Sequence, residues 1–207
     1  MAVVGYFLGS IPFGYLLVRI FRGEDVRKSG SGNIGATNVS RKSPALGVLT
    51  LLLDALKGTC AVLLANEVFM RMPPRNTDAS LYPPLSLVAL CAILGHMFPV
   101  WLRFRGGKGV ATSVGAFALL VPRATLGAFA IFVVVALLSR YVSLASIAAA
   151  VSLPIFAWFS LRHRDREGLL TLFPIAIAAA LVIAKHHENI HRLLAGTENR
   201  FGRREDK

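Results

Sequence analysis

A glycine-rich loop with several short polar side chains lies early in the chain. It runs from Ser29 to Asn38 and is followed by Arg41. Three glycines let backbone amides converge on a concavity, and four polar side chains add neutral hydrogen-bonding groups: Gly30, Gly32 and Gly35, with Ser31, Asn33, Thr37 and Asn38. Together with the guanidinium of Arg41, such a loop can hold a phosphate group, although the same composition is also typical of a solvated turn.

A second glycine-rich turn surrounds a lysine. Gly106, Gly107 and Gly109 bracket Lys108 directly before an apolar stretch. Backbone amides and a cation therefore stand at the expected N-terminus of a helix, where anions bind favourably. The turn is not a Walker nucleotide loop, because Leu102 stands where the first glycine is needed. The alternative interpretation is a short basic turn at the membrane surface.

Histidines accompany two polar clusters. His96 precedes the Lys108 turn and either holds that turn or reaches a substrate oxygen. In the C-terminal tail, His186 and Asn189 are three residues apart and share one helical face, as do Glu188 and Arg192 at four apart. The tail cluster either faces a pocket or is an ordinary polar end to the last helix.

Two charged residues stand inside an apolar segment. Asp54 and Lys57 are three residues apart, and buried charge in a membrane is costly, so they should pair and face the protein interior. A structural ion pair is the favoured interpretation. Ser143 and Ser146 open a later apolar segment, where a serine is usually a helix cap and sometimes a ligand.

Membrane helices must position these groups. The 207 residues are 55% hydrophobic and only 16% charged, with a mean hydropathy of +0.59, which indicates an all-α, polytopic membrane protein forming one domain over residues 1–207. We expect seven segments: Ala2 to Phe21, Leu46 to Met70, Leu85 to Leu102, Val110 to Val121, Ala124 to Ser139, Ser143 to Leu161 and Leu169 to Ala184. The fourth of these is short and should extend into its flanks or cross the bilayer incompletely.

The basic residues orient the chain. An outside N-terminus and a cytoplasmic C-terminus put 16 of the 23 Lys and Arg residues on the inner side, as the positive-inside rule requires. The first segment is not a typical signal peptide, because no basic residue precedes Arg19. All the dense polar motifs then lie on the inner side. The prolines Pro12, Pro154 and Pro174 break the pattern of three segments and should face the protein interior.

The sequence disfavours several functions. The net charge of +12 suits anionic lipids or substrates, and because the basic residues lie in short loops, no nucleic acid is expected. No metal site is suggested, since Cys60 and Cys91 lack metal-type spacing. A transporter would use broken helices and buried charge, but no inverted repeat is visible. A CoA-dependent acyltransferase would show a His-x4-Asp pair, which the sequence lacks.

The motifs taken together resemble the bacterial acyl-phosphate:glycerol-3-phosphate acyltransferases, the PlsY family. Three blocks carry the resemblance: Gly9-Ser-Ile-Pro-Phe-Gly14, Ser31-Gly-Asn-Ile-Gly-Ala-Thr-Asn38, and Gly95-His-Met-Phe-Pro99 with Gly106-Gly-Lys-Gly-Val-Ala-Thr112. Weaker echoes are Asp54 to Gly58, Ser143 to Ser146 and the tail pattern from His186 to Glu198. The resemblance implies a compact seven-helix bundle in the inner membrane, with its active site open to the cytoplasm.

The implied reaction moves a fatty acyl group from acyl phosphate to the 1-hydroxyl of glycerol 3-phosphate, which gives lysophosphatidic acid and phosphate, the entry step of phospholipid synthesis. By motif, Ser31 and Asn33 would lie beside the reacting groups. The amides of Gly106 and Gly107, with amides near Ser31, would cradle the donor phosphate, and Thr37, Asn38 and His96 would also bind substrate. The acceptor would be held by Arg41, Lys108, Ser146, His186 and Asn189, although Ser143 can replace Ser146.

The general base is open between His186 and a phosphate of the substrate, and the phosphate is favoured because no Ser-His-Asp arrangement is visible. No cofactor is expected. The expected partners are the two substrates, membrane lipids and an upstream enzyme that forms acyl phosphate.

Overall fold

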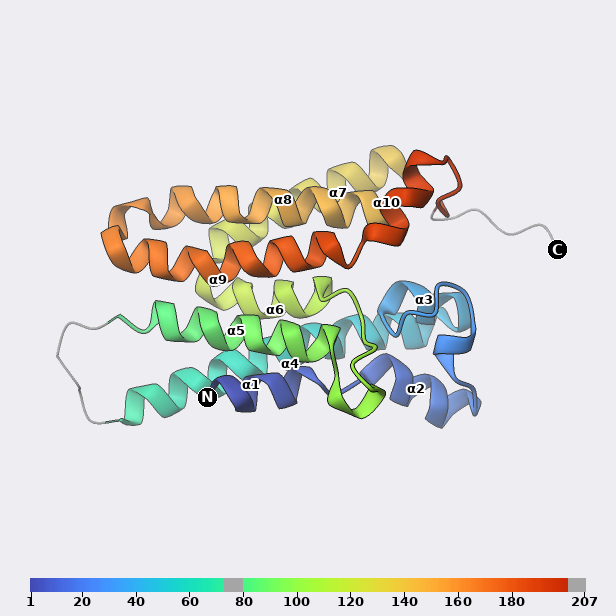
Figure 1. The fold of residues 1–207 in the computed structure, drawn as a ribbon, viewed down its shortest axis with the longest axis horizontal. Coiled ribbons are helices and arrows are strands. Elements are labelled where there is room, and N and C mark those ends of the chain that lie inside the picture. Colours follow the sequence, from blue (N-terminus) through green and yellow to red (C-terminus); the bar gives the residue numbers. More distant parts are fainter. Residues whose placement is uncertain (73–79, 201–207) are drawn as a thin grey trace. The chain divides into compact units, whose positions relative to one another are not determined.

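The described part of the chain consists of helices joined by turns and longer loops (Figure 1). A computed structural model describes residues 1–72 and 80–200, and no strand occurs within these ranges. The chain forms two compact units, Met1–Leu120 and Val121–Lys207, which are described separately below.

Within its described residues, 1–72 and 80–120, the first unit contains six α-helices. Its longest member, α4, begins with Ser43 as N-cap and Pro44 as its first residue, a pairing that favours helix initiation. The helices are α1 (Ala2–Gly9), α2 (Phe13–Arg22), α3 (Ala36–Lys42), α4 (Pro44–Arg71), α5 (Tyr82–Met97) and α6 (Val110–Leu120), with 3-10 turns at Val26–Lys28 and Val100–Leu102.

The described part of the second unit has three long helices packed in sequence and a short helix near the C-terminus. α7 packs along α8, and α8 packs along α9. The elements are α7 (Pro122–Ser139), α8 (Val142–Leu161), α9 (Asp165–Ala184) and α10 (His187–Leu194), with a 3-10 turn at Arg162–Arg164 between α8 and α9.

Five helical stretches within the described residues are long and apolar enough to cross a membrane: Ala2–Arg22, Pro44–Arg71, Tyr82–Leu102, Pro122–Ser139 and Val142–Ala184. The last of these contains both α8 and α9. All seven segments expected from the sequence therefore have helical counterparts. The fourth is α6, which has only 11 residues and does not extend into its flanks, so it spans about 16 Å along its axis.

The first segment is broken near Pro12, as expected, and Pro12 is buried. It breaks at Ser10–Pro12, because proline cannot continue the helical hydrogen-bond ladder. The freed carbonyl of Ile11 accepts hydrogen bonds from the Phe13 amide at 3.1 Å and from Nζ of Lys57 at 2.8 Å. By contrast, α8 and α9 run through Pro154 and Pro174, so the sequence overestimated the breaking effect of these two prolines. Pro174 is buried, as expected.

The predicted ion pair between Asp54 and Lys57 is confirmed. Oδ1 of Asp54 lies 2.8 Å from Nζ of Lys57, and both side chains are almost completely buried. Lys57 therefore joins α4 to the break between α1 and α2, and Asp54 offsets its charge inside the unit.

Close contact between α4 and α6 depends on glycine. A Cβ on Gly58 would overlap the carbonyl oxygen of Thr112, and one on Gly115 would overlap the carbonyl oxygen of Ala55. Small residues at such positions let helix backbones approach closely, which drives helix association where there is no hydrophobic effect between helices. The short helix α6 is held in place in this way.

We expect Asp54→Asn to destabilise the protein strongly, because it leaves the ammonium of Lys57 buried without a counter-charge. The cost of breaking a buried pair is about 3–5 kcal/mol. Thermal unfolding of the purified protein in detergent measures the change. The matched control is Glu67→Gln, which breaks the exposed pair with Arg71 on the same helix and should change little. Equal unfolding temperatures for Asp54→Asn and Glu67→Gln would contradict this role of Asp54.

Candidate active site

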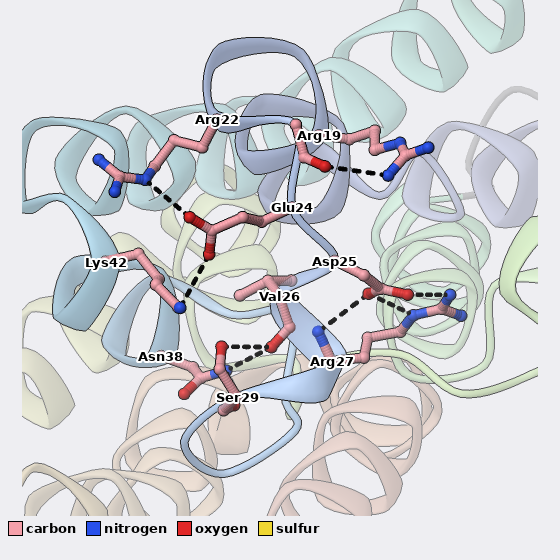
Figure 2. A network of polar contacts seen from close by, with 10 residues as sticks. Arg19, Arg22, Glu24, Asp25, Val26, Arg27, Ser29, Asn38 and Lys42 are labelled. Atoms are coloured by element: carbon pink, nitrogen blue, oxygen red, sulfur yellow. Dashed lines mark hydrogen bonds and ion pairs between the residues drawn. The ribbon is translucent and has the colours of Figure 1, made fainter.

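The side chain of Asn38 organises the first glycine-rich loop (Figure 2). Its Nδ2 group donates to the carbonyl oxygens of Val26 at 3.1 Å, Ser29 at 3.1 Å and Asn33 at 2.8 Å. Its Oδ1 atom accepts the amide of Ser31 at 3.1 Å. A single buried amide therefore fixes four points of the loop, which explains why the loop has one conformation despite its glycines.

The other polar side chains of the loop point outward or brace the turn. Ser31 and Thr37 are exposed, so their hydroxyl groups are open to a ligand. Oδ1 of Asn33 accepts the amide of Gly35 at 2.7 Å, a local turn that leads into α3. The loop thus presents Ser31 and Thr37 on a scaffold held by Asn38 and Asn33.

Acidic residues neutralise most of the cations near this loop (Figure 2). Glu24 lies 2.8 Å from Lys42 and 3.5 Å from Arg22. Asp25 forms a two-pronged contact with Arg27, and the hydrogen bonds from that guanidinium lower the pKa of Asp25 to about 2. These pairs leave the loop with fewer free cations than its composition suggests.

Arg41, on α3, is one exception beside the loop. It is exposed and makes no hydrogen bond or ion pair with any residue that the structure describes. Its Nη1 atom would lie 3.1 Å from a Cβ built on Gly30, so the guanidinium stands directly against that glycine. The structure therefore brings an uncompensated positive charge to the loop that carries Ser31.

The second glycine-rich turn differs from the expected amide cradle. The amide of Gly106 donates to the carbonyl of Met97 at 3.2 Å, and that of Gly107 donates to the carbonyl of His96 at 3.0 Å. Both donors are therefore engaged within the turn, and a role of these amides in holding phosphate stays a prediction.

Packing accounts for the two glycines instead. A Cβ on Gly106 would overlap the His96 carbonyl, and one on Gly107 would overlap the imidazole ring of His96. His96 is buried, and its Nδ1 atom lies 3.5 Å from Oδ1 of Asp54. Of the two interpretations of His96, this geometry favours the one in which it holds the turn. Lys108 follows, half-buried, just before α6.

In the second unit, one carboxylate gathers the tail residues. Oε1 of Glu198 accepts hydrogen bonds from Ser143 at 2.7 Å and Asn189 at 2.6 Å, and its Oε2 atom accepts one from Arg192 at 2.7 Å. Burial raises the pKa of Glu198, but the hydrogen bonds from Asn189, Ser143 and Arg192 outweigh burial and bring the pKa below the ordinary value. Glu198 is therefore charged at neutral pH.

Sequence reasoning missed this role of Glu198 and left two serines open. The structure turns Ser143 toward Glu198, whereas the hydroxyl of Ser146 donates to the carbonyl of Val142 on its own helix. The signal that could have found Glu198 is Gly196, whose φ of +70° reverses the chain after α10.

The remaining tail expectations have mixed outcomes. Glu188 and Arg192, which were expected to share a helical face, form an ion pair with Nη1 of Arg192 3.9 Å from Oε2 of Glu188. His186 and Asn189 are both buried, with His186 at the N-cap position of α10. Nδ1 of His186 donates to the carbonyl of Val182 at 2.7 Å, so in the neutral ring Nε2 carries the lone pair.

The fold and these loops define an all-helical integral membrane protein that presents cationic and polar groups at loops between apolar helices. Within the described residues, no three His, Cys, Asp or Glu side chains are grouped so that they could hold a metal ion.

Comparison with known proteins identifies the family. Residues 1–196 match the family model described as glycerol-3-phosphate acyltransferase. A glycerol-3-phosphate acyltransferase from Syntrophotalea carbinolica is 47% identical over 97% of this chain and 96% of its own length. One from Agrobacterium fabrum is 45% identical over 98% of this chain and 91% of its own.

Solved structures agree. This chain is similar to the crystal structure of PlsY (YgiH), an integral membrane glycerol 3-phosphate acyltransferase, in its glycerol 3-phosphate form. The TM-score is 0.84 and the sequence identity is 40%, and the match covers 97% of this chain and 94% of that chain. Its lysophosphatidic acid form matches with a TM-score of 0.80 and 39% identity, over 97% and 93% of the two chains. The chain belongs to the glycerol-3-phosphate acyltransferase family, whose activity serves phospholipid biosynthesis.

We expect Asn38→Ala to lower activity by at least about tenfold while the protein stays folded. Four loop contacts lose their partner, and the loop that presents Ser31 becomes mobile, so that groups held for a reaction lose their geometry. Initial-rate kinetics and limited proteolysis of the loop measure the two effects. Ser40→Ala is the control, since that hydroxyl only bonds the Thr37 carbonyl within α3. Wild-type rates for Asn38→Ala would contradict the inference.

Proposed function

We propose that the protein transfers a fatty acyl group from acyl phosphate to the 1-hydroxyl of sn-glycerol 3-phosphate, forming lysophosphatidic acid and inorganic phosphate. The observation that carries the proposal is Arg41, an unpaired cation held against the glycine-rich loop of Ser31. The related PlsY was solved in glycerol 3-phosphate and lysophosphatidic acid forms, which supports this acceptor and this product.

The acceptor phosphate is the proposed ligand of Arg41 and Lys108. Both are cations beside glycine-rich loops, and charge-assisted hydrogen bonds to phosphate are among the strongest that proteins make. By the motif resemblance, Asn189 and His186 are further proposed acceptor-binding residues. Within the second unit Ser143 takes the place of Ser146 in this proposal, because Ser143 shares the carboxylate of Glu198 with Asn189. Glu198 would act as a positioning residue that orients Asn189 and Arg192.

The donor is an activated anhydride, so the proposed reaction needs no covalent enzyme intermediate. The 1-hydroxyl oxygen attacks the acyl carbonyl carbon, the bond from that carbon to the phosphate oxygen breaks, and the electron pair leaves with phosphate. Ser31 and Asn33 stand beside the reacting groups in this scheme, with Thr37 next to them and Asn38 and His96 as positioning residues. The cations offset the repulsion between two anionic substrates, which is the main obstacle to bringing them together.

The hydroxyl proton passes to a phosphate oxygen of the substrates in the favoured scheme, since the second pKa of a phosphate monoester is near 6. His186 is the alternative base, because its donating Nδ1 leaves Nε2 as an acceptor in the neutral ring. Neither scheme uses CoA, a metal or another cofactor. A separate enzyme that forms acyl phosphate would supply the donor.

The proposed topology has seven membrane crossings within one domain, an outside N-terminus and a catalytic site on the cytoplasmic side of the bacterial inner membrane. The distribution of basic residues supports it. Single cysteines at Asp25 and Arg200 should be protected from an impermeant reagent in intact cells, and one at Asp165 should be labelled. Labelling at position 25 from outside would reverse the assignment.

With purified protein, palmitoyl phosphate should support acyl transfer to glycerol 3-phosphate and palmitoyl-CoA should not. The reason is that no His-x4-Asp pair is available to deprotonate the acceptor for a thioester donor. Formation of labelled lysophosphatidic acid from labelled glycerol 3-phosphate measures both reactions. Comparable turnover with the two donors would refute the proposed donor.

Arg41→Gln should raise the KM for glycerol 3-phosphate by about tenfold or more, with a smaller fall in kcat, because it removes a charge that binds the acceptor in both ground and transition states. Arg140→Gln is the control, because that arginine is also exposed and is not part of the proposed site.

The variant His186→Ala distinguishes the two candidate bases, a phosphate of the substrates and His186. A true general base contributes about 10²- to 10⁴-fold, mostly in kcat, whereas a residue that only holds the acceptor changes KM. We expect His186→Ala to raise the KM for glycerol 3-phosphate with little change in kcat, and we expect the same result for Asn189→Ala. An unchanged KM with a thousandfold lower kcat would assign the base to His186.

A further inference from the structure

A groove of about 1070 Å³ opens in the first unit, between α2, the turn Val26–Lys28 and the connection from α5 to α6. Its wall is apolar and aromatic, with Leu16 and Tyr15 from α2 and Trp101 and Leu102 from the connection. Gly106 and Gly32, a glycine of the Ser31 loop, line it, whereas Ser31, Arg41 and Lys108 do not. The groove therefore adjoins the Ser31 loop but has its own charged and aromatic side chains.

The groove carries an excess of positive charge. Arg27, Lys28, Arg103 and Arg105 line it together with a single carboxylate, Asp25. Asp25 is fully engaged by Arg27, at 2.9 and 2.7 Å. The other three cations form no hydrogen bond or ion pair through their side chains with any residue that the structure describes. Three uncompensated charges around one groove attract an anion of matching size.

The backbone holds one of these cations, Arg103, and the following Phe104 in an unusual conformation. Arg103 and Phe104 have φ angles of +53° and +62°, a left-handed region that costs free energy for residues other than glycine. Hydrogen bonds enforce it, from the amide of Arg103 to the Val100 carbonyl at 3.2 Å and from that of Phe104 to the Pro99 carbonyl at 3.0 Å. Such strain persists only where the surroundings enforce it, and here it keeps Arg103 and Arg105 on the groove.

The surroundings select among anions. Trp101 and Phe104 are 63% and 58% exposed beside the groove, although they are large and apolar. Tryptophan and tyrosine in a membrane protein gather at the interface with water, where lipid head groups lie, and basic residues at that level attract anionic head groups. A free phosphate ion would gain nothing from the apolar wall, whereas a lipid uses both parts of the groove.

We propose that this groove binds an anionic phospholipid of the bilayer. Its phosphate group lies against Lys28, Arg103 and Arg105, and its acyl chains follow the wall of Leu16, Trp101 and Leu102. The site is additional to the catalytic one, and lipid binding does not depend on the acyl transfer proposed above.

Trp101 offers a direct test in the whole protein. The chain has two tryptophans, so Trp158→Phe leaves Trp101 as the only one. In phosphatidylcholine vesicles, quenching of Trp101 by phosphatidylglycerol with brominated chains, compared with brominated phosphatidylcholine, gives the relative binding constant at the groove. We expect the anionic lipid to bind more tightly, and Arg103→Gln with Arg105→Gln to reduce that preference by about fivefold for each charge.

The matched control removes two other charges, Arg19→Gln with Arg140→Gln. Arg140 has a φ of +61°, like Arg103, and neither control residue lines the groove. The control should keep the preference. Lys28→Gln, on a different element, should reduce it by about fivefold and serves if the double variant fails to fold. An equal loss in the control would mean that general surface charge attracts the lipid, and no loss in the groove variants would overturn the proposal.

Competition separates the possible sources of the phosphate group. Neither inorganic phosphate nor lauroyl phosphate should relieve the quenching by the anionic lipid. Relief by inorganic phosphate would assign a free-anion site, and stoichiometric relief by lauroyl phosphate would assign the groove to the donor; either result overturns the proposal. The groove variants should keep wild-type acyl transfer in zwitterionic detergent, so that failure of lipid binding is distinguishable from failure of the proposed reaction.

Discussion

The hydrogen bond from Lys57 to the carbonyl of Ile11 is the interaction on which the rest of the first unit depends. A broken helix among apolar neighbours exposes backbone groups that lipid cannot satisfy, so the protein must supply the partner. Lys57 supplies it from α4, and Asp54 supplies the counter-charge. Ile11 and Pro12, at the break, also line the groove for which we propose lipid binding. The same carboxylate lies 3.5 Å from His96, whose ring packs against Gly107. One buried cluster thus touches the helix break and the turn before Lys108.

Acidic residues neutralise several of the cations near the glycine-rich loop of Ser31. Arg22, Arg27 and Lys42 are each matched by Glu24 or Asp25, and only some cations are left uncompensated. A composition count treats all of these as equivalent, but an ion pair removes most of a cation's pull on a ligand. Arg41 keeps its full charge because no carboxylate reaches it among the described residues. Its position against Gly30 places this charge beside the loop, and Asn38 holds the loop through the amide of Ser31.

Sequence periodicity and charge were sufficient for the helical segments and for pairs close along the chain. Asp54 with Lys57, and Glu188 with Arg192, follow from helical spacing alone. Contacts that link a side chain to a distant backbone group were not predictable. Nothing in the sequence near Lys57 points to Ile11, 46 residues away, and nothing near Ser143 points to Glu198, 55 residues away. The four bonds of Asn38 were missed for the same reason, since hydrogen-bond capacity is visible in a sequence but the partners are not.

The glycines of the Lys108 turn show how one composition can arise from two causes. Glycine permits a backbone to wrap an anion, and it also permits another group to approach where a Cβ would collide. At Gly106 and Gly107 the second cause applies, because the His96 carbonyl and ring occupy the space of the missing side chains. The amides are then committed to the carbonyls of Met97 and His96. If this turn binds phosphate in that conformation, the binding must come from the charge of Lys108 and from the first amides of α6, whose N-terminal end favours anions. A lysine suits that place better than an arginine, because a compact ammonium needs less room between glycines than a planar guanidinium does.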